Sequence, residues 1–528
     1  MILSWNCNGL ALHCDELINF LASSSSKPSV ICIQEVHHIE PSFDLNGYCM
    51  VSNCRLDRNG GGTAIFVKDD VQFRSIESSP SELEFTQVEI QLVKNSPIRI
   101  ISLYLPPSLK IVEAHLVRIF SHPNTFILGD LNARNPLWGS PCRNSRGKII
   151  EKLLKDSNFI CLNTGQGTRL NTSNGALSHL DVSFCSANLG QSSSWSVLDD
   201  SWGSDHYPTL TTYSNSVILE AFPEPKWNIS KANWNEFSQA LNDIAAFSPS
   251  IIDPLDSLSI AILEAANKFI PKQKVSNSTR RLPYWNDDCT NSINQRREAE
   301  KVMKNTQTFS DIFAFRKARA FVQFTLRKAK LDFWHLYVSN LSADSKLASV
   351  WKCLKSLSGH SSSARHFPLK IDGKFLCSNL EKANVFAKQF SFIGSNENLP
   401  SDYSIIRSST ALSFLSSKNS KTLLMPDLGS QALNFPFGME ELESALVLSN
   451  QRSSPDVDNI TMSMLFNLPP QAKFYLLSLF NYYWESCQVP PSWKHALINP
   501  IPKSNCNSNN ADAYRPIAIT SAYSKLLE

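Results

Sequence analysis

The sequence lacks the features that would place the protein in a membrane or outside the cell. No apolar run approaches the roughly 20 residues that a membrane-spanning helix needs. The 13 cysteines are odd in number, and no two of them form the Cys-x-x-Cys pair typical of zinc sites. Met1 leads directly into a strand-like run without a basic and hydrophobic leader. We therefore expect reduced thiols, no membrane contact, and a nuclear or cytoplasmic protein that is not secreted.

The composition indicates a globular protein with more than one domain. A chain of 528 residues with 42% hydrophobic residues can form two or three separate cores. Its net charge of +3 is unevenly distributed, because residues 1–213 hold 16 Lys and Arg against 20 Asp and Glu. Residues 268–330 hold 15 against 5. This basic segment is either a nucleic-acid-binding surface or a solvated helix face.

The spacing of apolar residues predicts an α/β domain of two packed sheets followed by a helical region. Short β-branched and aromatic runs alternate with polar loops up to about Tyr213. After a proline-bearing segment at 221–227 the pattern becomes helical. A long helix is expected over 311–341, with a core stripe at Ala318, Phe321, Val322, Ala329, Phe333 and Leu336.

Carboxylates and amides stand at the ends of the strand-like runs. Glu35 ends the run 30–34, where a carboxylate must be solvated, paired or metal-bound. Asp130 and Asn132 follow the run 126–128, and Asn8 lies two residues beyond Asn6, with both expected on one face of the first strand. Oxygen ligands of this kind suit a hard ion such as Mg²⁺, with Mn²⁺ as an alternative.

A histidine next to an aspartate completes the polar set. His206 follows Asp205, and Asp181 is available as a partner that orients the ring. A charged imidazole is a suitable donor to a phosphate oxygen. Together with a metal on oxygen ligands, these residues indicate a metal-dependent phosphodiesterase.

Several segments resemble known proteins when they are taken in order. The segments WNCNGL, CIQE, LYLPP, ILGDLNARNPLWGS, HLDVSF and GSDHYP resemble the endonuclease/exonuclease/phosphatase family, in the form found in arthropod-type non-LTR (LINE-like) retrotransposons. Farther on, SSPDVDNITMSML, VPPSWKHALINPIPK and AYRPIAITSAYSKLLE resemble the opening segments of the reverse transcriptase of such elements. The resemblance covers nearly the whole chain.

The resemblance implies roles for individual residues. Glu35 becomes the principal metal ligand, Asp130 acts on the attacking water, and His206, held by Asp181, binds the scissile phosphate. The implied catalytic residues are Asp130, Asn132, His206, Asp181, Tyr104 and Asn6, and the implied metal ligands are Glu35, Asn8 and Asp205. Read alone, Tyr104 is also compatible with a place in the core.

Three further positions bear on the substrate. Repair enzymes of the family carry a Trp at the position of Ser178, so its absence argues against specificity for abasic sites. The Gly- and Asn-rich segment 163–177, which includes Arg169, is expected to be either a mobile hairpin that enters a DNA groove or a plain surface hairpin. Arg134 stands where related elements usually have His, and we include it among the substrate-binding candidates.

The remaining sequence is expected to form a linker and part of a polymerase. We predict an endonuclease-like domain at 1–215 that is a four-layer sandwich of two sheets, a linker and basic helical region at 216–430, and an incomplete right-hand polymerase (fingers) segment at 431–528. The chain ends at Glu528 before the two aspartate motifs of a polymerase, so no polymerase activity is expected. The segment from Trp285 to Asp288 only mimics an aromatic-x-Asp-Asp motif.

The predicted function is Mg²⁺-dependent nicking of one strand of double-stranded DNA, which leaves a 3′-hydroxyl for target-primed reverse transcription. The element's RNA is an expected second partner, bound through the basic region. Two alternatives stay open from the sequence. The first is another phosphodiesterase of the superfamily, and the second is an inert or co-opted retrotransposon remnant that only binds nucleic acid.

Overall fold

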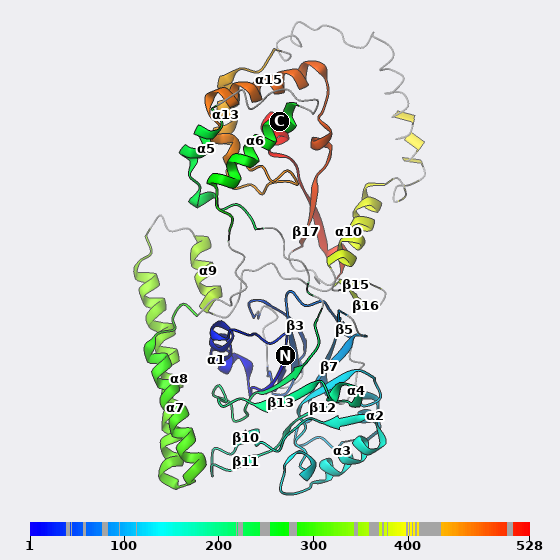
Figure 1. Cartoon of the computed structure of the whole chain (residues 1–528), viewed down its shortest axis with the longest axis vertical. Coiled ribbons are helices and arrows are strands. Elements are labelled where there is room, and N and C mark those ends of the chain that lie inside the picture. The colour runs from blue at the N-terminus through cyan, green and yellow to red at the C-terminus, as the bar shows by residue number, and fades with distance from the viewer. Residues whose placement is uncertain are drawn as a thin grey trace. The chain divides into compact units, whose positions relative to one another are not determined.

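The chain is divided into two compact units. The structure, a computed structural model, describes residues 1–528 except 38–42, 44, 56–59, 77–82, 94–95, 112, 218, 220–224, 243–253, 274–281, 343–346, 358–368, 372–373, 377–378, 396, 398–399, 401, 404, 407–408, 411–434 and 504–509. The first unit comprises 1–222 and 277–382, and the second comprises 223–276 and 383–528 (Figure 1). Residues 277–382, which the sequence assigns to a linker region, therefore group with the first 222 residues.

Two six-stranded sheets form the centre of the first unit. One sheet has the order β13-β14-β1-β2-β4-β3, with strands β1 (Ile2–Asn6), β2 (Val30–Gln34), β3 (Tyr48–Asn53), β4 (Thr63–Lys68), β13 (Ser193–Val197) and β14 (Thr209–Tyr213). The other has the order β5-β6-β7-β8-β12-β9, with strands β5 (Phe73–Ile76), β6 (Glu84–Ile90), β7 (Ile98–Tyr104), β8 (Thr125–Asp130), β9 (Phe159–Cys161) and β12 (Asp181–Ser186). A separate short hairpin pairs β10 (Arg169–Leu170) with β11 (Leu177–Ser178).

Side chains along the central strands point alternately to the two faces of the sheet, which explains the layers of the domain. In β2, Val30 and Cys32 enter the core between the two sheets, whereas Ile31 and Ile33 face the opposite side. Because both faces of such a strand are buried, the sequence reads as a continuous apolar run. Helix α1 (Leu10–Ser23) covers the outer face of the first sheet, and α2 (Glu113–Ile119) and α3 (Ser145–Asp156) cover that of the second. A short helix, α4 (Ala187–Gly190), follows β12. The predicted α/β four-layer sandwich is confirmed.

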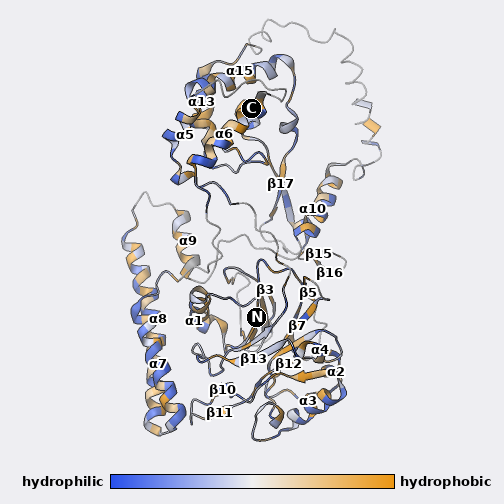
Figure 2. Cartoon of the chain, viewed as in Figure 1, coloured by the Kyte–Doolittle hydropathy of each residue, from blue (hydrophilic) through white to orange (hydrophobic). Residues whose placement is uncertain are grey.

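A long helical hairpin packs on the first sheet beside α1. It consists of α7 (Asp287–Thr306) and α8 (Phe309–Ser339), both with many hydrophilic residues (Figure 2). The Arg296 side chain on α7 is 1% exposed and donates to both carboxylate oxygens of Glu16 on α1, at 2.6 and 2.9 Å. Its Nη2 also donates to Asp200 Oδ1 at 2.7 Å. This buried guanidinium joins the hairpin to the sheet domain.

The predicted core stripe of α8 is correct only in part. Val322 and Ala329 are buried as expected, but Phe321 and Leu336 are 49% and 63% exposed. The buried face is instead formed by Ile312, Phe315, Val322, Leu326 and Ala329. The helix carries apolar residues around most of its circumference, so spacing alone did not distinguish the face that packs.

The Trp285–Asp288 segment begins helix α7. The side-chain oxygen of Asn286 caps the helix by accepting from Cys289 N at 3.0 Å. Asp287 and Asp288 therefore lie in the first helical turn, where negative charge is favourable. The first unit also contains α9 (Leu347–Leu357) and the pair β15 (Leu369–Ile371) and β16 (Lys374–Leu376).

The second unit is mainly helical. Its helices are α5 (Trp234–Ala240), α6 (Pro254–Phe269), α13 (Met439–Leu448), α14 (Met462–Phe466), α15 (Pro470–Ser486) and α16 (Ala522–Leu527), and most of α10 (Asn379–Gly394) also lies in it. All of these except α10 contribute to one apolar core. An antiparallel hairpin pairs β17 (Leu497–Pro502) with β18 (Tyr514–Ile519). In the described parts of both units, no helix combines the length and apolar character needed to cross a bilayer.

The buried guanidinium generates a prediction for stability. Arg296→Met should destabilise the first unit by about 3–5 kcal/mol, because Glu16 would remain buried without its guanidinium partner and Asp200 would keep only Arg297. Arg297→Met is the matched control, since Arg297 pairs with the same Asp200 but its side chain is 48% exposed. Arg297→Met should lower the free energy of unfolding by no more than about 1 kcal/mol. Urea unfolding of the full chain measures both, and equal effects would contradict the anchoring role of Arg296.

Candidate active site

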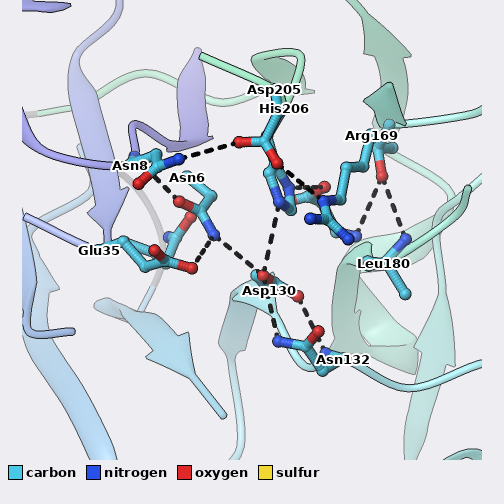
Figure 3. A network of polar contacts seen from close by, with 12 residues as sticks. Asn6, Asn8, Glu35, Asp130, Asn132, Arg169, Leu180, Asp205 and His206 are labelled. Atoms are coloured by element: carbon cyan, nitrogen blue, oxygen red, sulfur yellow. Dashed lines mark hydrogen bonds and ion pairs between the residues drawn. The ribbon is translucent and has the colours of Figure 1, made fainter. Parts of the chain in front are cut away.

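The polar motifs meet at one edge of the sandwich. Strands β1 and β2 are parallel, so the residues at their ends, Asn6 and Glu35, lie at the same edge of the first sheet. In the second sheet, β12 runs antiparallel to β8 in a register that places Asp181, the first residue of β12, opposite Asp130, the last residue of β8. Figure 3 shows the resulting network, to which both sheets contribute.

Asn6 links the two sheets. Its Nδ2 donates to Glu35 Oε1 and to Asp130 Oδ2, both at 2.9 Å. Asn6 is fully buried, whereas the side chain of Glu35 is 22% exposed. One amide therefore holds two carboxylates at a fixed separation and offsets part of their repulsion.

Asn8 does not continue the first strand as expected. Strand β1 ends at Asn6, and Asn8 adopts a left-handed backbone with φ of 47°. This turn directs its Nδ2 to Asp205 Oδ1 at 3.3 Å. Asp205 also accepts from Arg169 Nε at 2.9 Å. Burial opposes ionisation of Asp205, but the charges of His206 and Arg169 lower its pKa overall.

Asp130 and Asn132 form a tight turn after β8. Asn132 has a φ of 48°, and its backbone N–H donates to Asp130 Oδ1 at 2.9 Å. Its Nδ2 donates to Leu105 O at 3.1 Å and to Asp130 Oδ2 at 3.3 Å. Burial raises the pKa of Asp130 well above the range of an exposed carboxyl group. The turn thus holds a buried acid whose proton affinity is suited to accepting a proton from water.

His206 lies between two buried acids. Its Nδ1 donates to Asp181 Oδ2 at 2.8 Å, and its Nε2 lies 3.9 Å from Asp130 Oδ2. Burial alone lowers the pKa of the ring, but the carboxylates of Asp181 and Asp130 raise it to about 9 overall. The imidazole is therefore charged at neutral pH.

Tyr104 lies at the end of β7, opposite Asp130 in the parallel register with β8. The residue is 5% exposed, so both the phosphate-side position and the core position considered from the sequence remain compatible with its burial. Burial raises the pKa of Tyr104, and the carboxylate of Glu35 raises it further. Its hydroxyl is therefore a neutral donor beside Glu35.

Of the three substrate-binding candidates, only Arg169 contacts the polar network directly. Arg169 pairs with Asp205 at the network itself. Ser178 lies on β11, where its Oγ is 3.5 Å from Arg169 O, and is half-buried. Arg134 is exposed, and its side chain contacts Cys142 Sγ at 3.9 Å rather than the polar network.

Sequence reasoning missed several residues that position the site. Arg146 on α3 donates to five backbone carbonyls, those of Leu105, Pro106, Pro107, Leu109 and Leu131, and so fixes the loops that follow β7 and β8. Ser204 Oγ donates to Asn6 O at 2.8 Å and accepts from His206 N at 3.2 Å. Trp5 Nε1 donates to His206 O at 3.1 Å. A single Arg in an amphipathic helix gives no sequence signal for such a role, although Ser204 was part of a recognised motif.

One group of residues in the site has the close spacing of ligand atoms that a metal ion needs. Asp130, Asp181 and His206 place ligand atoms within 4.8 Å of one another, the one such group of His, Cys, Asp and Glu found among the described residues. Asp181 Oδ1 is buried and has no hydrogen-bond partner among the described residues. The ligands predicted from the sequence are Glu35, Asn8 and Asp205. The carboxylates of Glu35 and Asp205 are 22% and 18% exposed, and Asn8 contacts Asp205.

Comparisons with known proteins agree with the motifs. Residues 98–210, which include the segments from Tyr104 to His206, match a family described as endonuclease-reverse transcriptase. A probable RNA-directed DNA polymerase from transposon BS of Drosophila melanogaster is 24% identical over 549 residues, which cover 100% of this chain and 58% of the relative. The RNA-directed DNA polymerase from mobile element jockey of the same species is 24% identical, with coverage of 99% and 57%. The chain thus spans less than two thirds of the length of these relatives.

Two solved structures each match about two fifths of this chain. The endonuclease domain of TRAS1, a telomere-specific non-LTR retrotransposon, shares 22% identity and a TM-score of 0.35, over 40% of this chain and 96% of that domain. The catalytic domain of Xenopus laevis APE2 shares 18% identity and a TM-score of 0.35, over 42% and 94%. The family and relative matches confirm the resemblance to endonuclease–reverse transcriptase proteins of non-LTR retrotransposons. Residues 98–210, which match this family, lie in the first unit.

The charged state of His206 generates a prediction for stability. The pKa of His206 in the folded protein, about 9, lies above its ordinary value of 6.5. The charged ring therefore contributes fully to the free energy of unfolding below pH 6.5, and this contribution is lost as the pH rises through about 9. The stability advantage of the wild type over His206→Gln should fall by about 3 kcal/mol across this window. Thermal or urea unfolding at both ends of the window measures it. Asp181→Asn should shift the loss to lower pH, and a pH-independent advantage would contradict a charged ring.

Proposed function

We propose that the first unit is a Mg²⁺-dependent endonuclease that nicks one strand of double-stranded DNA and leaves a 3′-hydroxyl. The observation that carries this proposal is the charged imidazole of His206, held at 2.8 Å by Asp181 and at 3.9 Å from the buried Asp130. A cationic donor next to a buried acid fits a reaction in which water attacks a phosphodiester. In the whole retrotransposon protein, the released 3′-hydroxyl would prime reverse transcription.

The metal ion is assigned to the open side of the site, with Glu35 as its main ligand and Asn8 and Asp205 beside it. A charged imidazole has no free lone pair, so the set that contains His206 is less suited to a cation at neutral pH. Carboxylate and amide oxygens favour Mg²⁺, and Mn²⁺ is also compatible. When bound, the ion would polarise the phosphodiester and offset the charge that develops on it.

The remaining residues act on the water and the phosphate. Asp130 accepts a proton from the attacking water, and the backbone N–H of Asn132 keeps its carboxylate oriented. His206 donates to a non-bridging phosphate oxygen, while Asp181 holds the ring and preserves its charge. Asn6 and the hydroxyl of Tyr104 complete the polar wall around the phosphate.

The proposed partners are the target DNA and the element's RNA. With Ser178 in place of a pocket-lining Trp, intact duplex is the preferred substrate over an abasic site. RNA binding is assigned to the basic residues beyond the sheet domain. These substrates place the activity in the nucleus or the cytoplasm.

Nicking of plasmid DNA by the full chain tests the proposed activity. The wild type should convert supercoiled plasmid to open circles in Mg²⁺ and lose this activity in EDTA. Glu35→Gln and Asp130→Asn should each slow nicking at least a hundredfold, since removing one such electrostatic group costs about 2.7–4 kcal/mol.

Glu113→Gln provides the control for these variants, because this acid pairs with Lys152 on the outer helices and should leave the rate unchanged. A second plasmid that contains one abasic site should be nicked no faster than the intact plasmid. Full activity in Asp130→Asn would refute the proposed role of this acid, and a strong preference for the abasic plasmid would indicate a repair enzyme.

The place of the metal is a separate prediction. Mg²⁺ at roughly a hundred times its Kd should stabilise the wild type by about 2.7 kcal/mol, which is visible as a rise in Tm. Glu35→Gln should abolish this rise, whereas Asp181→Asn should retain it. The opposite pattern would place the ion among Asp130, Asp181 and His206 instead.

A further inference from the structure

The α7–α8 hairpin reaches the catalytic side of the sheet domain. Tyr207, which directly follows His206, donates from its hydroxyl to Glu300 on α7. Leu170 of the β10–β11 hairpin shares a small buried core with Met303, Ile312 and Phe315 of α7 and α8. The β10–β11 hairpin is therefore packed against the helices on one side and does not stand free as a loop.

One edge of α8 carries a row of cations along this side. Arg316, Arg319, Arg327 and Lys330 follow one another at intervals of three, eight and three residues, which places them on one edge of a helix. Arg316 Nε donates to Thr172 O at 3.0 Å, Arg319 Nη2 donates to Gly203 O at 2.8 Å, and Lys330 pairs with Asp15 of α1 at 2.7 Å. The row therefore follows the sheet domain from the turn between β10 and β11 to α1.

One member of the row, Arg319, lies next to the segment that carries His206. Gly203, the acceptor for Arg319, directly precedes the Ser204-Asp205-His206 segment. From Arg316 to Lys330 the helix rises about 21 Å, equivalent to roughly six base pairs of DNA. A duplex whose scissile phosphate meets His206 has further phosphates within reach of this length of helix.

The charge distribution favours these cations as a surface that binds a polyanion. Residues 1–213 are net negative, with 16 Lys and Arg against 20 Asp and Glu. Residues 287–339 of the hairpin hold 10 against 6. Arg316 and Arg327 are exposed, and within the described residues Arg327 has no side-chain partner, so both can neutralise phosphates without breaking the core.

We propose that this row on α8 binds the phosphate backbone of the DNA duplex on one side of the nick. The proposal rests on the proposed endonuclease function and identifies a surface for its substrate outside the sheet domain. Arg316 and Arg327 contact the phosphates directly, while Arg319 and Lys330 hold the edge of the helix against the sheet domain.

Neighbouring residues supply a matched control. Lys317 and Lys328 are exposed and follow Arg316 and Arg327 by one residue each, so they lie on the other edge of the exposed face. Phe313, Phe324 and Leu331, all more than half exposed, separate the two edges. Arg316→Gln/Arg327→Gln and Lys317→Gln/Lys328→Gln therefore remove the same charge from the same helix on different edges.

Binding of a fluorescent duplex to the full chain in EDTA, measured against salt concentration, tests the proposal without catalysis. The arginine variant should bind more than tenfold more weakly at about 0.1 M salt, and the slope of log K against log salt should become shallower by about two. The lysine variant should keep the wild-type slope. Circular dichroism should show the same helix content in all three proteins.

Equal losses in both variants, or none in either, would overturn the proposal. Tighter binding of a single strand through the same arginines would also overturn it, because the occupant would not be a duplex. The nicking assay separates this result from the proposed function. If the wild type nicks DNA and the two variants bind the duplex with equal affinity, only the proposed role of the row is refuted. If the arginine variant binds the duplex more weakly than the lysine variant but the wild type does not nick DNA, only the endonuclease assignment is refuted.

Discussion

The amide of Asn6 is the interaction on which the site depends most. Its Nδ2 donates to a carboxylate from each sheet, Glu35 and Asp130, and the residue is completely buried. Without this shared donor, two acids would face each other at the edge of a sandwich whose core permits little adjustment. The site is therefore a property of how the two sheets pack, because neither sheet alone holds both acids in place.

The pKa values of Asp130 and His206 are raised for different reasons. Burial raises the pKa of Asp130, which favours a proton on the acid, whereas Asp181 and Asp130 together raise the pKa of His206 to about 9 and keep the ring charged. In the proposed mechanism, Asp130 would accept a proton and His206 would stabilise negative charge.

Much of the fold and of the site could be predicted from the sequence, for identifiable reasons. The run 30–34 has its predicted bounds, because a strand buried on both faces is apolar throughout. The polar motifs were recognisable because each follows such a strand, and the structure brings most of them into one network. Asn8 was expected on the strand but lies beyond it, since a left-handed turn cannot be read from residue spacing. Arg146 and Arg296 were missed because their partners are backbone carbonyls and acids far away in sequence.

The helical hairpin of α7 and α8 groups with the sheet domain, although the two are far apart in the sequence. The sequence pattern changes near residue 215, and two buried acids before that point, Glu16 and Asp200, both pair with Arg296 of the hairpin. Asp200 lies just before the segment that carries Asp205 and His206, so the helical hairpin supports this segment from outside the sheet domain. The hairpin, residues 287–339, is also net positive, whereas residues 1–213 are net negative. Support of this segment and compensation of charge are therefore two consequences of one packing arrangement.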